Sequence, residues 1–178
     1  MTLNLSKIIL GGGCFWCTEG VFQLVRGVEK VVSGYTGGAT LNPTYMQVCS
    51  GQTGHAEVIE VSFNPEVISL TELLDIFFHL HNPTTLNKQG ADAGTQYRSA
   101  VYYLDDAQLP IIQQALEAAQ ADFPDKIVTE VTKLNIFYPA ENYHQNYFKN
   151  HPEQGYCQLV INPKISKLKQ KYISKIQD

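Results

Sequence analysis

The chain has 178 residues, of which 44% are hydrophobic, and its formal net charge is −4 at pH 7. This composition predicts one globular domain over residues 1–178 with a sizeable core, and the negative charge argues against nucleic acid as a partner. No stretch reaches the roughly 18 apolar residues of a membrane span, and four cysteines are too few for a disulfide scaffold.

The apolar run near the start is shorter than the h-region of a secretory signal. We therefore expect a cytoplasmic protein, in which thiols stay reduced unless catalysis oxidises them. The small size also predicts a monomer.

The first part of the chain alternates between strand and helix patterns. A short buried strand is predicted at 7–10, where glycine ends it, and apolar spacing predicts a helix over 15–25. Alternating residues at 28–35 and 56–63 predict two more strands. Between them, residues 37–54 form a loop rich in Gly, Asn, Pro, Thr and Ser, and so long a loop in a compact domain is often functional.

The later part of the chain continues in the same manner. Apolar spacing predicts a helix over 70–78 with Ser69 as its N-cap, followed by a second long polar loop at 81–96. The remaining predicted elements are a strand at 99–104, a helix at 105–121, a strand at 127–132, and a loop and helix segment from about 140 onwards.

The order strand-helix-strand-strand-helix-strand runs from residue 7 to residue 104. It predicts an α+β fold, a two-layer α/β sandwich of the ferredoxin-like, split βαβ type with a mixed sheet and long active-site loops.

The stretch LGGGCFWCTE, residues 10–19, carries the clearest chemical signal. Cys14 follows a strand and a glycine turn and begins a helix, so its sulfur should lie near unpaired N–H groups and the positive end of the helix dipole. Both favour the thiolate, which is the nucleophilic form of cysteine. We therefore predict a reactive thiol at Cys14.

Three chemistries are compatible with this thiol. Cys14 and Cys17 form a C-x-x-C pair that would exchange disulfides, but one such motif is a weak signal. A zinc site would need Cys49 and Cys157 as well, and these two are single and far apart, unlike the paired ligands of structural zinc. The third chemistry is a nucleophile beside an aromatic pocket, for which Phe15 and Trp16 would supply rings.

Other segments carry groups that would complement such a nucleophile. The first long loop contains NPTY, which ends at Tyr45, and the strand after it opens with GHAE, which includes Glu57. The second loop ends in DAGTQYRS, which contains Asp92 and Tyr97. We expect these carboxyl and phenol groups to converge on the turn that carries Cys14.

Taken together, these motifs resemble the peptide methionine sulfoxide reductase A family. The resemblance covers about residues 7–163 and rests on GCFWC, GYTGGATLNPTYMQVCSGQTGHAEVIEV, GTQYRS, YHQNY and GYC. It implies an oxidoreductase that reduces the S epimer of methionine sulfoxide, free or in proteins, and so repairs oxidative damage. It implies no cofactor and no metal, and thioredoxin or a similar dithiol as the reductant.

The resemblance also implies a role for each matching residue. Cys14 attacks the sulfoxide sulfur and becomes a sulfenic acid, and Glu57 protonates the oxygen. Tyr45 and Tyr97 hydrogen-bond that oxygen, and Asp92 orders the pocket through hydrogen bonds. A carboxyl group among aromatic rings loses solvation, which raises its pKa and keeps a proton available near neutral pH.

The resemblance gives the aromatic residues a part in substrate binding. Phe15 and Trp16 match positions that enclose the S-methyl group, and Tyr147 matches a further tyrosine of the pocket. Burial of a methyl group against apolar surface contributes about 0.8 kcal/mol.

The other cysteines depart from the family pattern. Many members have glycine where Cys17 stands, and carry two cysteines in a glycine-rich tail, of which only Cys157 remains here. We expect Cys157 to condense with the sulfenic acid, with Cys17 as its rival, and Cys49 to be a packed structural residue. Two other classes stay open: a general thiol–disulfide oxidoreductase that uses Cys14 and Cys17, and a non-catalytic module that binds oxidised or methionine-rich segments.

Overall fold

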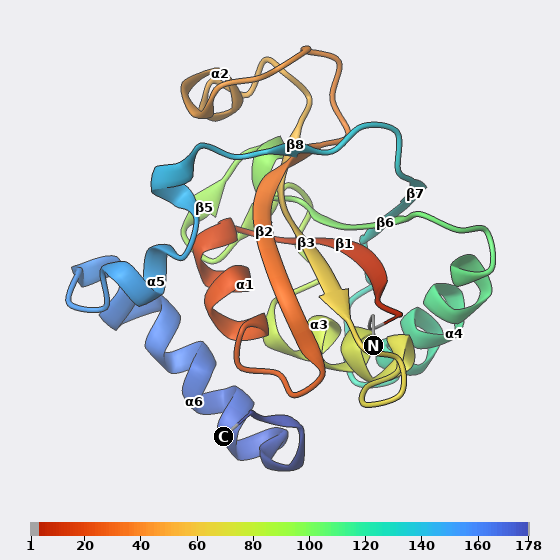
Figure 1. Ribbon diagram of the computed structural model, residues 1–178. Coiled ribbons are helices and arrows are strands. Elements are labelled where there is room, and N and C mark those ends of the chain that lie inside the picture. The colour runs from red at the N-terminus through yellow and green to blue at the C-terminus, as the bar shows by residue number, and fades with distance from the viewer. Residues whose placement is uncertain (1–3, 178) are drawn as a thin grey trace.

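A computed structural model describes residues 4–177; residues 1–3 and 178 of the expected domain lie outside the described residues. Its main sheet has the strand order β7-β6-β1-β3-β2-β8 (Figure 1). The strands are β1 (Ser6–Gly12), β2 (Val28–Thr36), β3 (Ala56–Phe63), β6 (Ser99–Tyr103), β7 (Glu130–Lys133) and β8 (Tyr138–Pro139). Neighbouring strands are antiparallel except for β6 and β7, so the predicted mixed sheet and α+β class are confirmed.

Four longer helices pack into the same apolar core on one face of this sheet. They are α1 (Phe15–Phe22), α3 (Leu70–Leu80), α4 (Gln108–Gln120) and α6 (Asn162–Lys171). Shorter helical segments are α2 (Tyr45–Cys49), α5 (Tyr147–Asn150), the π-helical turn Cys157–Ile161, and the 3-10 turns Thr95–Tyr97, Asn142–His144 and Ile173–Lys175.

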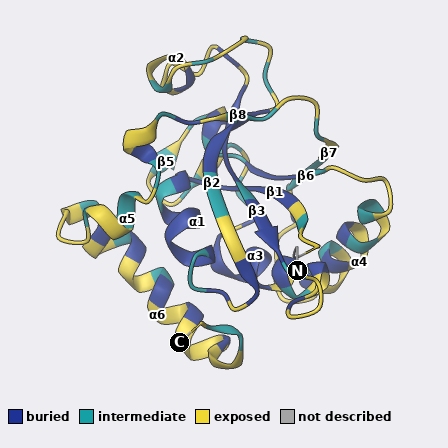
Figure 2. Cartoon of the chain, viewed as in Figure 1, coloured by how far each residue is buried: buried dark blue, intermediate teal, exposed yellow. Residues whose placement is uncertain are grey.

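The alternation of side chains along the strands explains the two faces of the sheet. Ile8 and Leu10 of β1 point into the core shared with the helices. Ile9 of β1 and Val58 of β3 point to the opposite face, where a smaller apolar cluster is covered by Phe137. Burial is deepest in the sheet and in α1, whereas α2, α5 and α6 are exposed along much of their length (Figure 2).

The predicted N-cap of α3 is confirmed. Ser69 Oγ accepts a hydrogen bond from Glu72 N–H at 3.1 Å, and Glu72 Oε2 accepts one from Ser69 N–H at 3.0 Å. This capping box satisfies two of the N–H groups that every helix start leaves free.

Both predicted long loops contain short elements that apolar spacing does not reveal. Thr44 and Gln47 form a second capping box, which begins the five-residue helix α2 within the first loop. The second loop folds back as a hairpin of β4 (Lys88–Gln89) and β5 (Asp92–Ala93). These elements depend on side-chain hydrogen bonds and turns rather than on a periodic apolar face.

Element ends also differ from the predictions. α1 ends at Phe22 rather than at residue 25, because the chain turns there and Val25 pairs with Ile176. α4 begins at Gln108 rather than at residue 105, and β7 begins at Glu130. Among residues 4–177, no helix has the length and apolar character needed to cross a membrane.

Candidate active site

Cys14 lies at the start of α1, directly after β1 and a glycine turn, as predicted. Gly13 has a φ of 99°, and a Cβ atom at that position would lie 2.7 Å from Gln89 Cγ, so glycine is required there. Cys17 N–H donates to the Cys14 carbonyl oxygen at 3.1 Å and closes the first helical turn. The Cys14 side chain is buried, with 8% of the residue exposed.

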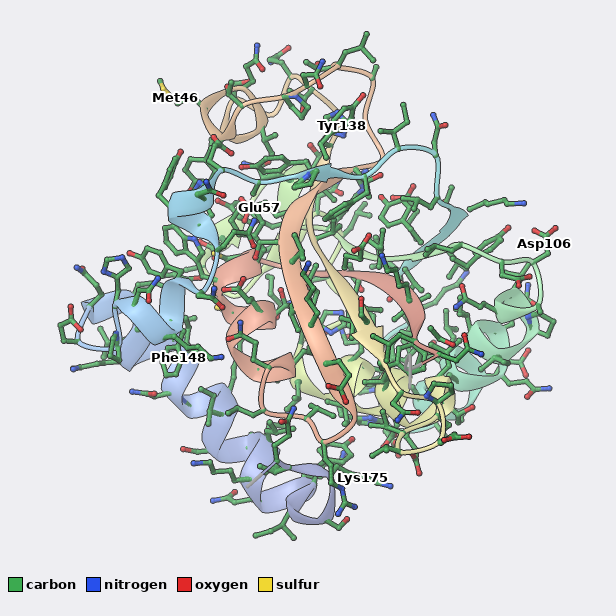
Figure 3. The ribbon with its side chains drawn as sticks, viewed as in Figure 1. Met46, Glu57, Asp106, Tyr138, Phe148 and Lys175 are labelled. Atoms are coloured by element: carbon green, nitrogen blue, oxygen red, sulfur yellow. The ribbon has the colours of Figure 1, made fainter. Side chains whose placement is uncertain are left out.

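Glu57 lies beside this turn because β3 is the central neighbour of both β1 and β2. Phe15 N–H donates to Glu57 Oε1 at 3.1 Å, whereas Oε2 is buried and has no hydrogen-bond partner among residues 4–177. Burial raises the pKa of Glu57 to about 8, although the Phe15 N–H group opposes the shift. Glu57 therefore keeps its proton at neutral pH, and Oε2 is the oxygen free to carry it. Figure 3 shows Glu57 next to the start of α1.

Aromatic rings form a wall around the first turn of α1. The Trp16 indole stacks on the Tyr147 ring with 3.8 Å between centroids and 8° between planes. Phe15 is fully buried and lies 6.4 Å from Tyr45 and 5.1 Å from His144, centroid to centroid. These rings provide apolar surface of the kind that binds a methyl group.

His144 orients Trp16 within this wall. Trp16 Nε1–H donates to His144 Nδ1 at 3.0 Å, so Nδ1 must be unprotonated. Burial lowers the pKa of His144, which keeps the ring neutral with its proton on Nε2. Nε2 is buried and has no hydrogen-bond partner in the part of the chain that the structure describes.

Glu141 fixes the rim of the wall on the side of Tyr45. It accepts hydrogen bonds from Tyr35 Oη–H at 2.9 Å, from Tyr45 N–H at 2.9 Å and from Tyr143 Oη–H at 3.2 Å. Burial raises the pKa of the Tyr45 and Tyr97 phenols, and the charge on Glu57 raises it further. Both phenols therefore keep their protons and remain hydrogen-bond donors.

Asp92 is linked to the site by a hydrogen bond from Tyr156. Tyr156 Oη–H donates to Asp92 Oδ2 at 3.2 Å. The Tyr156 hydroxyl oxygen also lies 3.3 Å from Cys17 Sγ. The Tyr156 ring also meets the Trp16 indole edge-on, with centroids 5.7 Å apart. Tyr156 thus joins the pocket, the second cysteine and the carboxylate that was predicted to order the site.

The thiols of Cys14 and Cys17 titrate as a pair. The neighbouring Cys14 thiol lowers the pKa of Cys17 to about 7, helped by the charge of Lys164. The proximity of Cys17 raises the pKa of Cys14, and burial raises it further. This differs from the predicted thiolate at Cys14. The start of α1 favours one thiolate in the pair. Burial disfavours a negative charge on Cys14, so Cys17 is the thiol that ionises first.

The two remaining cysteines occupy different environments. Cys157 follows Tyr156, begins the π-helical turn and is fully buried, and its pKa is raised by that burial and by the charge on Cys17. Cys49 is exposed, which corrects the expectation of a packed structural cysteine. The reason is that α2 is short and buries only Val48. Among residues 4–177, no three His, Cys, Asp or Glu side chains form a group that would hold a metal ion.

The structure therefore gathers the predicted site residues around the first turn of α1. They are Cys14, Phe15, Trp16, Tyr45, Glu57, Asp92, Tyr97 and Tyr147. The sequence did not assign a role to Tyr156, His144 or Glu141. Tyr156 and His144 lie in motifs that marked the family resemblance, whereas no pattern in the sequence distinguishes Glu141 from the other acidic residues of the chain.

The chain is similar to known proteins in sequence and in structure. Residues 6–177 match the family model described as peptide methionine sulfoxide reductase. The chain is 54% identical over 167 residues to "Peptide methionine sulfoxide reductase MsrA" of Pasteurella multocida, covering 94% of this chain and 96% of that protein.

Two solved structures of Mxr1 from Saccharomyces cerevisiae are also similar. The reduced form has a TM-score of 0.80 at 38% identity, covering 86% of this chain and 89% of that one. The form in complex with Trx2 has a TM-score of 0.57 at 30% identity, covering 80% of this chain and 84% of that one. With a family match over nearly its whole length, the chain belongs to the peptide methionine sulfoxide reductase family.

Proposed function

We propose that this reductase removes the oxygen from the S epimer of methionine sulfoxide with Cys14 as the nucleophile and Glu57 as the proton donor. The observation that supports it most is the hydrogen bond from Phe15 N–H to Glu57 Oε1 at 3.1 Å. This bond holds a protonated carboxyl group beside the cysteine and leaves its second oxygen free. A sulfoxide oxygen leaves sulfur readily only when it is protonated, so the two groups complement each other.

The reaction balances with these two groups. The Cys14 sulfur attacks the sulfoxide sulfur, and Glu57 gives its proton to the oxygen. The hydroxyl group passes from the substrate sulfur to the Cys14 sulfur as the new sulfur–sulfur bond breaks, so methionine leaves with its sulfur reduced by two electrons and Cys14 becomes a sulfenic acid. The thiol proton of Cys14 replaces the proton that Glu57 has given, so the protons balance without a further group.

The aromatic wall accounts for substrate binding. Phe15, Trp16 and Tyr147 would enclose the S-methyl group, and the phenols of Tyr45 and Tyr97 would donate to the oxygen as its negative charge grows. Asp92 would act indirectly, because it holds the Tyr156 hydroxyl group in place.

The proposed reductase activity is tested with the two epimers of methionine sulfoxide in the presence of dithiothreitol. We expect the S epimer to yield methionine and the R epimer to remain. Reduction of insulin disulfides without release of methionine would instead indicate general thiol–disulfide exchange. Reduced thioredoxin is the proposed physiological reductant, supported by the solved complex of the similar yeast protein Mxr1 with Trx2.

The contacts favour Cys17 over Cys157 as the thiol that condenses with the sulfenic acid, with release of water. Cys17 lies one helical turn from Cys14, and its lowered pKa provides thiolate near neutral pH. Cys157 is fully buried in the π-helical turn, and its raised pKa leaves it mainly as the thiol at neutral pH.

We therefore expect Cys17→Ser to stop disulfide formation. After one turnover without reductant, this variant should retain a sulfenic acid that dimedone traps, whereas the matched variant Cys157→Ser should lose two thiols as the unmodified chain does. Mass spectrometry of the trapped proteins measures both. A persistent sulfenic acid in Cys157→Ser, and none in Cys17→Ser, would assign the role to Cys157.

Tyr156→Phe should slow disulfide formation and leave the release of methionine unchanged. The substitution removes the hydroxyl group next to Cys17 Sγ, which helps to lower the pKa of that thiol, so less thiolate is present at pH 7. One such hydrogen bond predicts about a fivefold slower loss of the second thiol. Rapid-quench measurements should show an unchanged burst of methionine followed by the slower thiol loss; a smaller burst would place Tyr156 in the reduction step instead.

We also infer that the chain forms one catalytic domain of the ferredoxin-like, split βαβ type. The strand order β6-β1-β3-β2, with α1 after β1 and α3 after β3, supports this topology. A monomer and a cytoplasmic location remain predictions from the sequence.

A further inference from the structure

Glu19 is a buried carboxyl group that the proposed reaction does not use. It belongs to α1, its exposed fraction is 0%, and burial raises its pKa. Among residues 4–177, no lysine, arginine or histidine nitrogen lies within salt-bridge distance of it. Burial of a carboxyl group costs free energy of folding unless hydrogen bonds compensate for the lost solvation.

Both oxygens of Glu19 have partners on other elements. Tyr147 N–H donates to Oε1 at 3.1 Å, and Ser33 Oγ–H donates to Oε2 at 3.2 Å. Tyr147 is the first residue of α5, and the residue before it, Asn146, has a φ of 56° and makes no capping bond with its side chain. Glu19 therefore supplies from α1 the acceptor that the start of α5 lacks.

The surrounding packing brings α5 close enough for this contact. A Cβ atom on Gly20 would lie 3.3 Å from Phe148 Cβ, so the missing side chain of Gly20 allows Phe148 to pack against α1. Gln145 ties the same segment to β2, because its amide group accepts from Ser33 N–H and donates to the Ser33 carbonyl oxygen, both at 2.9 Å.

The position of Tyr147 matters because its ring stacks on Trp16. Trp16 and Glu19 are three residues apart on α1 and so share one helix face. One helix thus carries the indole of the stack and the carboxyl group that holds the backbone of the stacked tyrosine. We propose that Glu19 is a positioning residue that keeps Tyr147 on Trp16 and thereby sets the shape of the methyl-binding wall.

The test uses Glu19→Gln, which keeps the shape of the side chain and turns one of its two acceptors into a donor. Trp16 is the only tryptophan of the chain, so its fluorescence reports on the stack directly. We expect a shifted emission and stronger quenching by acrylamide. For S-methionine sulfoxide we expect KM to rise about tenfold, about 1.4 kcal/mol, with kcat within about twofold, because the wall binds substrate and transition state alike.

Two further variants make the result specific. Glu72→Gln removes a carboxylate that also accepts a backbone N–H group at a helix start, but far from Trp16, and should change neither emission nor KM. Ser33→Ala removes only the bond to Oε2 and should give a smaller shift in the same direction; it carries the test if Glu19→Gln does not fold.

The proposal is overturned if a folded Glu19→Gln keeps the emission and KM of the unmodified chain, or if kcat falls with KM unchanged. The KM part of this inference rests on the proposed function, but the fluorescence part does not. If the unmodified chain released no methionine, the proposed function would fail, while the emission of Glu19→Gln would still decide the role of Glu19.

Discussion

Glu57→Gln should lower the rate of methionine release at pH 7 by about 10²- to 10⁴-fold, the usual contribution of a general acid. The glutamine oxygen can still accept the Phe15 N–H hydrogen bond, so the pocket should keep its shape. What is lost is the proton for the leaving oxygen. Single-turnover release of methionine, measured with the reduced protein and no reductant, isolates this step from recycling.

The rate of methionine release should also depend on pH in a definite direction. The pKa of Glu57 is raised to about 8 and the protonated form is the active one, so the rate should fall as the pH rises through about 8. This alkaline decline should be absent in Glu57→Gln. Burial of the carboxyl group also lowers the free energy of unfolding as the pH rises from its unfolded pKa, about 4.3, to the folded value, and the loss persists above it, so the variant should be more stable than the unmodified chain at pH 8.

Glu60→Gln is the matched control, because Glu60 lies on the same strand and pairs only with Lys7 at 3.4 Å. We expect its rate to stay within about twofold of the unmodified chain, as is usual for a surface ion pair. A folded Glu57→Gln that keeps both the full rate and the alkaline decline would exclude Glu57 as the proton donor.

Cys14→Ser should abolish methionine release, with a loss of more than about 10⁴-fold, the order found when a nucleophile is removed. A serine hydroxyl group is a far weaker nucleophile than a thiol and forms no sulfenic acid. Cys17 remains in this variant with its neighbour altered, so residual activity would show whether it substitutes. The measurement is methionine released per chain under excess substrate.

Binding should survive in the same variant. Trp16 lies in the proposed pocket, so quenching of its fluorescence by methionine sulfoxide reports binding without turnover. Retained binding with no methionine released is the expected pair of results. Methionine release at the normal rate from Cys14→Ser would show that another thiol attacks the substrate.

The sequence predicts the sheet and the long helices because these elements depend on apolar periodicity. The alternation in β3 and the spacing of Leu73, Leu74 and Phe77 in α3 correspond to buried faces. It does not predict α2 or the hairpin of β4 and β5, which arise from capping and turns. Nor does it predict that Val25 pairs with Ile176, since that contact joins distant parts of the chain.

The candidate site divides in the same way. The motifs identified the cysteine, the acid and the aromatic residues that gather at α1. They did not show that Cys17 has the lowered pKa, because that depends on the burial of Cys14 and on how close the two thiols lie in the fold. The Tyr156 hydroxyl group lies between Cys17 and Asp92, which are 139 and 64 positions away from it in the chain, and no local pattern predicts such contacts.

The central claim is that one cysteine takes up the oxygen and a second thiol then closes a disulfide. It is tested by mixing the fully reduced protein with excess S-methionine sulfoxide and no reductant, and counting methionine and thiols. We predict about one methionine released and two thiols lost per chain, with peptide mapping that joins Cys14 to Cys17. No methionine from reduced, folded protein would contradict the account.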